Sequence, residues 1–146
     1  MKISIGTDHG GVELKGMIVG WLSARGHEVR DCGTQGAASV DYPDFGAAVG
    51  RDVASGRSER GIVICKSGIG MSIAANKIDG VRAALCMNTR MAELSRLHNN
   101  ANVLVLGAMW CGDINIGELL DVWLSTGFEG GRHQARVDKI TSLEKD

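Results

Sequence analysis

Several features that would indicate other protein classes are scarce in this sequence. It contains one proline, Pro43, and few aromatic residues: three tryptophans, one tyrosine and two phenylalanines. No apolar run approaches the ~20 residues that a membrane-spanning helix requires. The segment 1–6 becomes polar too early for a signal peptide. We therefore expect a cytoplasmic protein that does not bind membranes.

The charges are nearly balanced, with 16 lysine and arginine residues against 17 aspartate and glutamate residues. Nucleic-acid binding needs clustered positive charge, so this balance argues against a nucleic-acid partner. The four cysteines, Cys32, Cys65, Cys86 and Cys111, lack the CxxC spacing of zinc fingers and thioredoxin-like proteins. We therefore expect reduced thiols and no bound metal.

Glycine is abundant, at 21 of 146 residues, and apolar residues follow the spacing of alternating strands and helices. The predicted strands are residues 2–7, 27–31, 61–65, 81–86 and 102–107. The predicted helices are residues 12–25, 42–55, 68–77, 89–98 and 114–125, with a last helix that begins after residue 133 and ends near residue 144. Such alternation favours a parallel sheet covered on both faces. We predict a single α/β domain over residues 1–146, with ligands bound beyond the carboxyl ends of the strands.

A glycine-rich loop, Cys65-Lys66-Ser67-Gly68-Ile69-Gly70, follows an apolar strand and precedes a helix. The amino terminus of a helix carries free N–H groups and partial positive charge, which lower the pKa of a thiol and stabilise an oxyanion. The alternative is that Cys65 is a small buried hydrophobic residue. The loop lacks the endings of a P-loop and of a dinucleotide site, and Met71 stands where thiol phosphatases have arginine. These absences favour proton transfer by Cys65 over phosphoryl transfer.

Polar residues with acid–base chemistry follow other predicted elements. Asp8 and His9 end the first strand, where Asp8 either exchanges protons with a hydroxyl or only caps a helix, and His9 can donate to an anion. His98 ends a helix, where it is either a general acid–base group or a partner of the helix dipole. These side chains suit proton transfer on a small substrate that carries hydroxyl groups.

A cationic cluster near the carboxyl terminus suits a phosphate group. Arg132 and Arg136 are four residues apart, so they share one face if the segment is helical, and His133 lies between them. Arginines bind phosphate in a bidentate manner. The alternative is a solvated charged tail. The whole set indicates a phosphorylated substrate and chemistry without a cofactor.

These motifs resemble the type B ribose-5-phosphate isomerases, whose family also holds the galactose-6-phosphate isomerase subunits. The matching segments are residues 6–11, 41–44, 61–65, 67–77, 95–99 and 128–133. The resemblance implies a Rossmann-like three-layer α/β/α sandwich with a five-stranded parallel sheet. It also implies a homodimer, or a tetramer made of two dimers, in which the subunits share active sites and the last helix packs on the partner subunit.

The resemblance implies a cofactor-free interconversion of ribose 5-phosphate and ribulose 5-phosphate through an enediolate. Cys65 is then the base that moves a proton between C2 and C1, and Ser67 keeps a hydroxyl beside it. The enediolate oxygen is held by the backbone N–H groups of Gly68, Ile69 and Gly70.

The other site residues are implied to open the sugar ring and to bind its substituents. Asp8 and His98 form the ring-opening pair, and Asn99 binds sugar hydroxyls. The phosphate group is held by His9, Arg132 and Arg136, of which the arginines come from the partner subunit.

Three residues depart from the pattern of this family. Lys66 stands where glycine is common, Arg90 where a substrate-facing tyrosine is common, and Met109 where arginine is common. We expect Arg90 to bind substrate and to supply cationic character that is missing at Met109. Allose 6-phosphate, galactose 6-phosphate and a tetrose phosphate therefore stay open as substrates. Two non-enzymatic alternatives are a flavodoxin-like carrier, which the few aromatic residues disfavour, and a sugar-phosphate sensor.

Overall fold

A computed structural model describes residues 1–145 and places five parallel strands in one sheet of order β2-β1-β3-β5-β4. The strands are β1 Lys2–Thr7, β2 Glu28–Asp31, β3 Arg60–Cys65, β4 Ala83–Leu85 and β5 Val103–Gly107. The helices are α1 Val12–Ala24, α2 Tyr42–Ala54, α3 Ile69–Ala75, α4 Thr89–Asn99, α5 Ile116–Ser125 and α6 Arg132–Ser142. Short 3-10 helices span His9–Gly11, Ala108–Asp113 and Leu143–Lys145.

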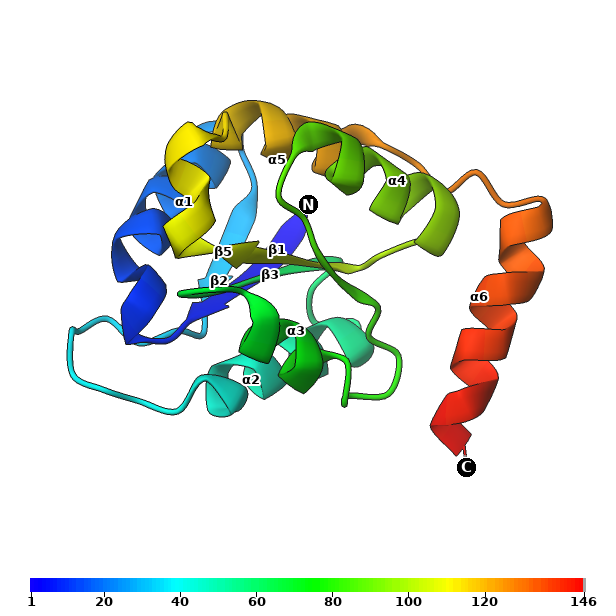
Figure 1. Ribbon diagram of the computed structural model, residues 1–146, viewed down its shortest axis with the longest axis horizontal. Coiled ribbons are helices and arrows are strands. Elements are labelled where there is room, and N and C mark those ends of the chain that lie inside the picture. Colours follow the sequence, from blue (N-terminus) through cyan, green and yellow to red (C-terminus); the bar gives the residue numbers. More distant parts are fainter. Residues whose placement is uncertain (146) are drawn as a thin grey trace.

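The helices form two layers on the two faces of the sheet. Figure 1 shows α1, α4 and α5 above the sheet and α2 and α3 below it. This arrangement confirms the predicted α/β/α sandwich with a five-stranded parallel sheet. None of the described helices is long and apolar enough to cross a membrane.

The central strands β3 and β5 are apolar over residues 61–65 and 103–107, because helices cover both faces of the sheet. In β3, Ile62 and Ile64 pack toward α1 and α5, whereas Val63 and Cys65 join a second cluster with Val49 of α2. β5 alternates in the same way, with leucines on the first face and valines on the second. Burying each such side chain contributes about 1.5–3 kcal/mol relative to exposure.

Several predicted boundaries differ from the structure, and three of them have a local cause. The fourth strand is shorter than residues 81–86, because the N–H of Arg82 donates to the side chain of Asn102 over 2.8 Å. The helix expected from residue 114 begins at Ile116, where Asn115 caps the first turn by accepting from the N–H of Glu118 over 3.0 Å. The last helix begins earlier than expected, at Arg132, after two glycines with positive φ.

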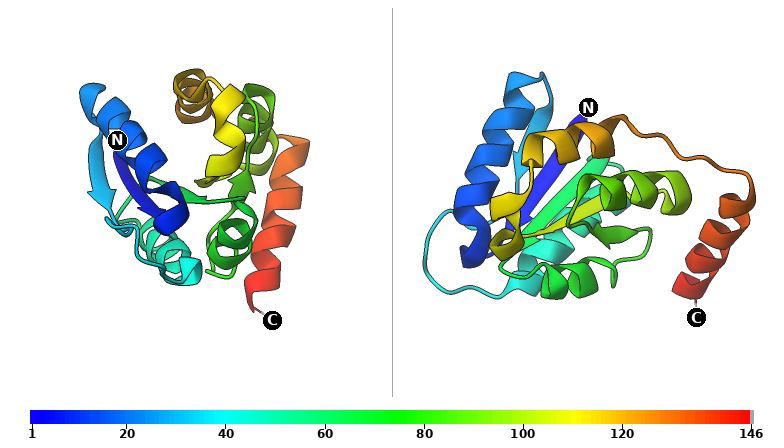
Figure 2. Two further views of the ribbon diagram at one scale, coloured as in Figure 1. Left: turned by 60° about the vertical axis from the view of Figure 1, so that its left-hand side comes forward. Right: turned by 45° about the horizontal axis from the view of Figure 1, so that its top comes forward.

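Helix α6 lies at the margin of the molecule. A segment without regular structure, residues 126–130, leads to it from α5, and Figure 2 shows it beside the main body in both views. His133 and Val137 are the buried residues of α6. The rest of its surface is largely exposed, so most of this helix makes no contact with the sheet.

Candidate active site

The carboxyl ends of β1, β3 and β5 meet at a cavity of about 490 Å³. Residues that follow the three strands line it, as expected for a parallel sheet. They are Asp8, His9, Gly10, Lys66, Ala108 and Met109. The glycine-rich loop 65–70 lies against this cavity, because Lys66 belongs to both.

Cys65 is the last residue of β3 and is 5% exposed. Its sulfur accepts a hydrogen bond from the backbone N–H of Gly68 over 3.2 Å. Burial raises the pKa of Cys32 and Cys111, and raises the pKa of Cys86 to about 11. Those three thiols are therefore protonated at neutral pH and unsuited to act as a base.

Hydrogen bonds fix the loop to the 3-10 helix that follows β5. The carbonyl of Lys66 accepts from the N–H of Met109, and the carbonyl of Ser67 accepts from Nε1 of Trp110, both over 3.0 Å. Gly68 has φ of 80°, and an added Cβ would lie 2.6 Å from the side chain of Leu85. Only glycine fits there, so the loop has one tightly defined conformation.

The backbone donors of the loop are partly occupied. The N–H of Gly68 donates to Cys65, and the N–H of Ile69 donates to the Ser67 hydroxyl over 3.3 Å. The N–H of Gly70 lies in the first turn of α3, where a helix supplies no acceptor. Of the three donors expected to hold an oxyanion, two are thus already bonded within the loop.

Tyr42 covers this loop, a role that the sequence analysis missed. An added Cβ on Gly70 would lie 2.5 Å from Cζ of Tyr42, so the aromatic ring lies directly over Gly70. The residue is the first of α2. Its sequence signal is its position in a motif shared with the type B isomerases, since the local pattern predicts only the start of a helix there.

Asp8 is buried and caps the 3-10 helix that follows β1. Its Oδ1 accepts from the N–H of Gly10 over 2.9 Å. Oδ2 takes part in none of the hydrogen bonds recorded for residues 1–145, and the residue lines the cavity. Asp8 therefore caps the helix through Oδ1, as one of its two expected roles required. Its Oδ2 is left for a ligand.

His9 follows Asp8 and is exposed at the same cavity. Its Nδ1 accepts a hydrogen bond from the backbone N–H of Val40 over 3.2 Å. A neutral imidazole whose Nδ1 accepts carries its proton on Nε2. His9 thus presents an N–H donor, as binding of an anion requires.

A second cluster of polar residues lies where α4 and α6 meet. The rings of His98 and His133 stack at 4.2 Å between centroids and 13° between planes. The carboxylate of Glu129 lies 3.8 Å from Nε2 of His98 and 3.9 Å from Nε2 of His133. Desolvation lowers the pKa of His133, and the charges of His98 and of neighbouring arginines lower it further.

The ligand atoms of these three residues lie within 4.8 Å of one another, and among residues 1–145 this is the group that could surround a metal ion. The lone pairs of nearly parallel rings run side by side and do not converge on one point. A tetrahedral zinc site needs ligand atoms that converge at about 2.0–2.1 Å for nitrogen. The arrangement is therefore not a preformed metal site.

The two clusters lie at opposite ends of the sheet within one chain. A helix that connects two parallel strands runs antiparallel to them. The end of α4 therefore lies beside the amino ends of the strands, far from Cys65. Figure 1 shows α4 ending next to α6, away from the turn between β1 and α1. None of the hydrogen bonds and ion pairs recorded for residues 1–145 joins His98 or Asn99 to Asp8, His9 or Cys65. One chain therefore does not bring together the whole predicted site.

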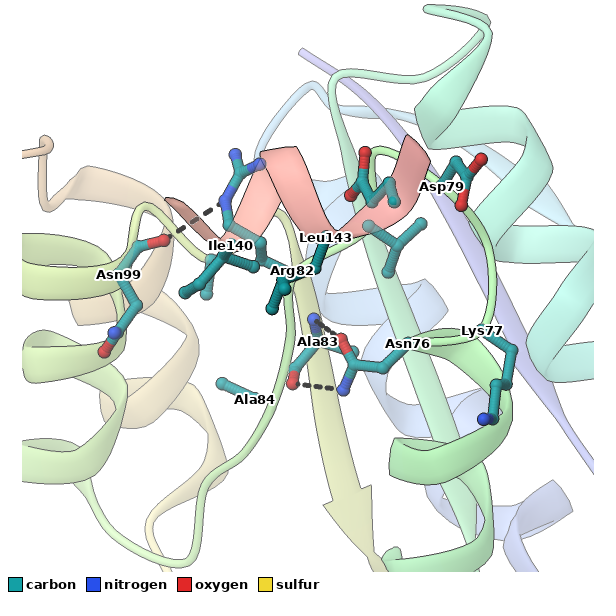
Figure 3. Close-up of a pocket in the computed structure, with 12 residues that line it drawn as sticks. Asn76, Lys77, Asp79, Arg82, Ala83, Ala84, Asn99, Ile140 and Leu143 are labelled. Atoms are coloured by element: carbon teal, nitrogen blue, oxygen red, sulfur yellow. Dashed lines mark hydrogen bonds between the residues drawn. The ribbon is translucent and has the colours of Figure 1, made fainter. Parts of the chain in front are cut away.

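The remaining predicted residues have surroundings of their own. Arg132 and Arg136 are exposed on the same face of α6. Asn99 lines a cavity of about 650 Å³ between β4 and α6 (Figure 3). Its backbone carbonyl accepts a hydrogen bond from Nε of Arg82 over 3.2 Å. Arg90 is 68% exposed in its side chain and forms an ion pair with Glu93, and it does not line the cavity beside Cys65.

Comparisons with known proteins agree with one another. A family model described as Ribose/Galactose Isomerase matches residues 3–140. Ribose-5-phosphate isomerase B of Escherichia coli is 46% identical over 144 residues, which are 99% of this chain and 97% of that protein.

Solved structures give the same result. Ribose-5-phosphate isomerase B of Clostridium thermocellum superimposes with a TM-score of 0.96 and 55% identity, covering 99% of this chain and 98% of that one. The enzyme of Mycoplasma genitalium, solved with bound ribulose-5-phosphate, gives a TM-score of 0.94 at 41% identity over 99% of this chain and 97% of that one. These similarities extend over the whole fold.

Proposed function

This chain belongs to the ribose/galactose isomerase family, and from that membership we propose that it interconverts ribose 5-phosphate and ribulose 5-phosphate. The chain matches ribose-5-phosphate isomerases B over their full length. A relative of the same fold holds ribulose-5-phosphate. The reaction is an aldose–ketose isomerisation that moves one proton between adjacent carbons.

The observation that carries the proposal is the environment of Cys65. Its sulfur lies at the carboxyl end of β3 and accepts a backbone N–H at 3.2 Å, and the next residue, Lys66, lines the cavity of Asp8 and His9. A general base beside fixed hydrogen-bond donors is what an enediolate mechanism requires.

The proposed reaction begins with ring opening by the free oxygen of Asp8 and by His98, while Asn99 binds sugar hydroxyls. The Cys65 thiolate then removes the proton from C2, and the released electron pair forms the C1–C2 double bond of the enediolate. Negative charge gathers on O1, where the Ser67 hydroxyl and the unoccupied N–H of Gly70 stabilise it.

The reaction ends when Cys65 returns its proton to C1 and the C2 hydroxyl proton passes to O1, which leaves a carbonyl at C2 and a hydroxyl at C1. The phosphate group stays fixed during these steps. We assign it to His9, Arg132 and Arg136.

We infer that the active site is shared between two subunits of a homodimer. His98 and Asn99 lie at the opposite end of the sheet from Cys65, so they complete a site only when they come from another chain. A two-fold dimer uses the same surface twice and so completes two sites at once. Helix α6, which stands off from its own sheet, is then positioned to pack on the partner (Figure 2).

The test is a panel of aldose phosphates assayed for ketose formation by the purified chain in the presence of a chelator. We expect ribose 5-phosphate to give the highest kcat/KM, with no loss when metals are removed. Faster turnover of allose 6-phosphate, galactose 6-phosphate or a tetrose phosphate would reassign the substrate within the family. Binding of sugar phosphates without any turnover would instead indicate a sensor, and a bound flavin would indicate a carrier.

A further inference from the structure

Lys66 lies directly after Cys65 and lines the cavity at the carboxyl ends of β1, β3 and β5. Its backbone is held in place, because its carbonyl accepts from the N–H of Met109 over 3.0 Å. Its side chain is exposed and takes part in none of the hydrogen bonds and ion pairs recorded for residues 1–145. A cation is thus anchored next to the proposed base without a partner among residues 1–145.

The loop after β1 passes directly against Lys66. An added Cβ on Gly10 would lie 3.2 Å from the backbone nitrogen of Lys66 and 3.3 Å from its Cβ. Glycine at this position therefore lets the two loops approach each other. The result is that His9, with its Nε2–H donor, and Lys66 share one cavity although they follow different strands.

The charges of the cavity require a cation if an anion is to bind there. Asp8 is buried in the same wall and its carboxylate repels a phosphate. Arg90, the residue expected from the sequence to supply positive charge, is instead paired with Glu93 and does not line this cavity. Among the residues that line the cavity, Lys66 is the single lysine or arginine.

We propose that the Lys66 ammonium binds the phosphate group of the sugar substrate in this cavity, together with the Nε2–H of His9. The inference rests on the proposed function and adds a residue to its phosphate site. A lysine binds phosphate as a point charge on a flexible stem, so it needs no bidentate geometry. Because the side chain is exposed, the contact is weakened by salt.

The first test measures binding of inorganic phosphate to the full-length protein by calorimetry. Lys66→Met is expected to raise the Kd about tenfold, since a hydrogen bond to a charged group is worth enough for such a change. Lys66→Arg keeps the charge and is expected to stay within about threefold of the wild type. Lys2→Met makes the same change at the amino end of β1 and is expected to leave the Kd unchanged.

The second test measures the kinetics of ribose 5-phosphate isomerisation at low and high salt. Lys66→Met is expected to raise KM about tenfold with little change in kcat, and to reduce the dependence of KM on salt. A purely structural role would not change the salt dependence. Lys66→Arg is expected to restore most of it.

The proposal is overturned if Lys66→Met binds inorganic phosphate as tightly as the wild type, or if the wild type itself binds none. A failure of the proposed function would look different. The wild type would then convert none of the aldose phosphates, although its binding of inorganic phosphate would still depend on Lys66.

Discussion

The sulfur of Cys65 accepts the backbone N–H of Gly68 over 3.2 Å, and this single contact connects the proposed base to the shape of its loop. Gly68 donates this N–H from a left-handed conformation that side chains rarely adopt. The position of the donor, and with it the environment of the thiol, therefore depends on a glycine at residue 68.

Replacing Cys65 by alanine is expected to lower kcat by about 10²–10⁴-fold, the usual contribution of a general base. The methyl group of alanine fits the space of the thiol, so the fold and the binding of phosphate are expected to persist. Steady-state kinetics and calorimetry with inorganic phosphate measure the two effects.

The matched control is Cys111→Ser, which keeps a donor to the carbonyl of Gly107. This variant is expected to retain near-wild-type turnover. Near-wild-type turnover in Cys65→Ala would remove this residue from the mechanism.

Replacing Gly68 by alanine is expected to destabilise the protein and to reduce turnover. An alanine there strains the backbone at φ of 80° and places its Cβ 2.6 Å from Leu85. Together these effects are expected to cost roughly 2–4 kcal/mol of unfolding free energy.

Gly26 provides a control that separates strain from collision. It has the same φ of 80° but no atom within 4 Å of an added Cβ. Gly26→Ala is therefore expected to cost only about 1–2 kcal/mol in urea unfolding and to leave turnover unchanged. Equal losses of stability in the two variants would show that contact with Leu85 is unimportant.

The sheet was predictable because residues 61–65 of β3 and all of β5 are apolar and are flanked by helices. The extent of β4 was not, because it depends on the bond between the backbone of Arg82 and the distant side chain of Asn102. Similarly, the early start of α6 depends on how Gly130 and Gly131 turn the chain. Such contacts join residues whose proximity no local pattern reveals.

The candidate site was predictable where chemistry follows strand ends, as at Asp8, His9 and Cys65. His98 was expected beside these residues but lies at the opposite end of the sheet. Its position at the end of a helix that runs antiparallel to the strands already implies this separation. The ring of Tyr42 over Gly70 and the contact of Glu129 with two histidines could not be foreseen. Both depend on packing between elements that are distant in sequence.

Acidification is expected to destabilise the fold partly through His133. Its folded-state pKa is lowered from 6.5 by burial and by the charges of His98, Arg132 and Arg136, which outweigh the opposite effect of Glu129. As the pH falls below 6.5, the unfolded chain therefore takes up a proton before the folded chain does. Stability is lost over this range until the folded histidine also protonates.

The measurement is urea unfolding between pH 7.5 and pH 5 at one protein concentration. His133→Phe keeps an aromatic ring against His98 and removes the titration, so its stability is expected to fall less steeply than that of the wild type. Parallel curves for the two proteins would contradict the assignment.

Complementation between inactive variants tests whether two chains build each active site. Cys65→Ala and His98→Ala are each expected to be nearly inactive as homodimers. If His98 acts on the partner's substrate, a mixed dimer has one site that carries both defects and one site that carries neither. Random mixing makes about half of all dimers mixed, so denaturing and refolding the two variants together should restore about a quarter of wild-type turnover. If each chain instead supplies its own His98, every site in the mixture keeps one defect, and refolding together restores nothing.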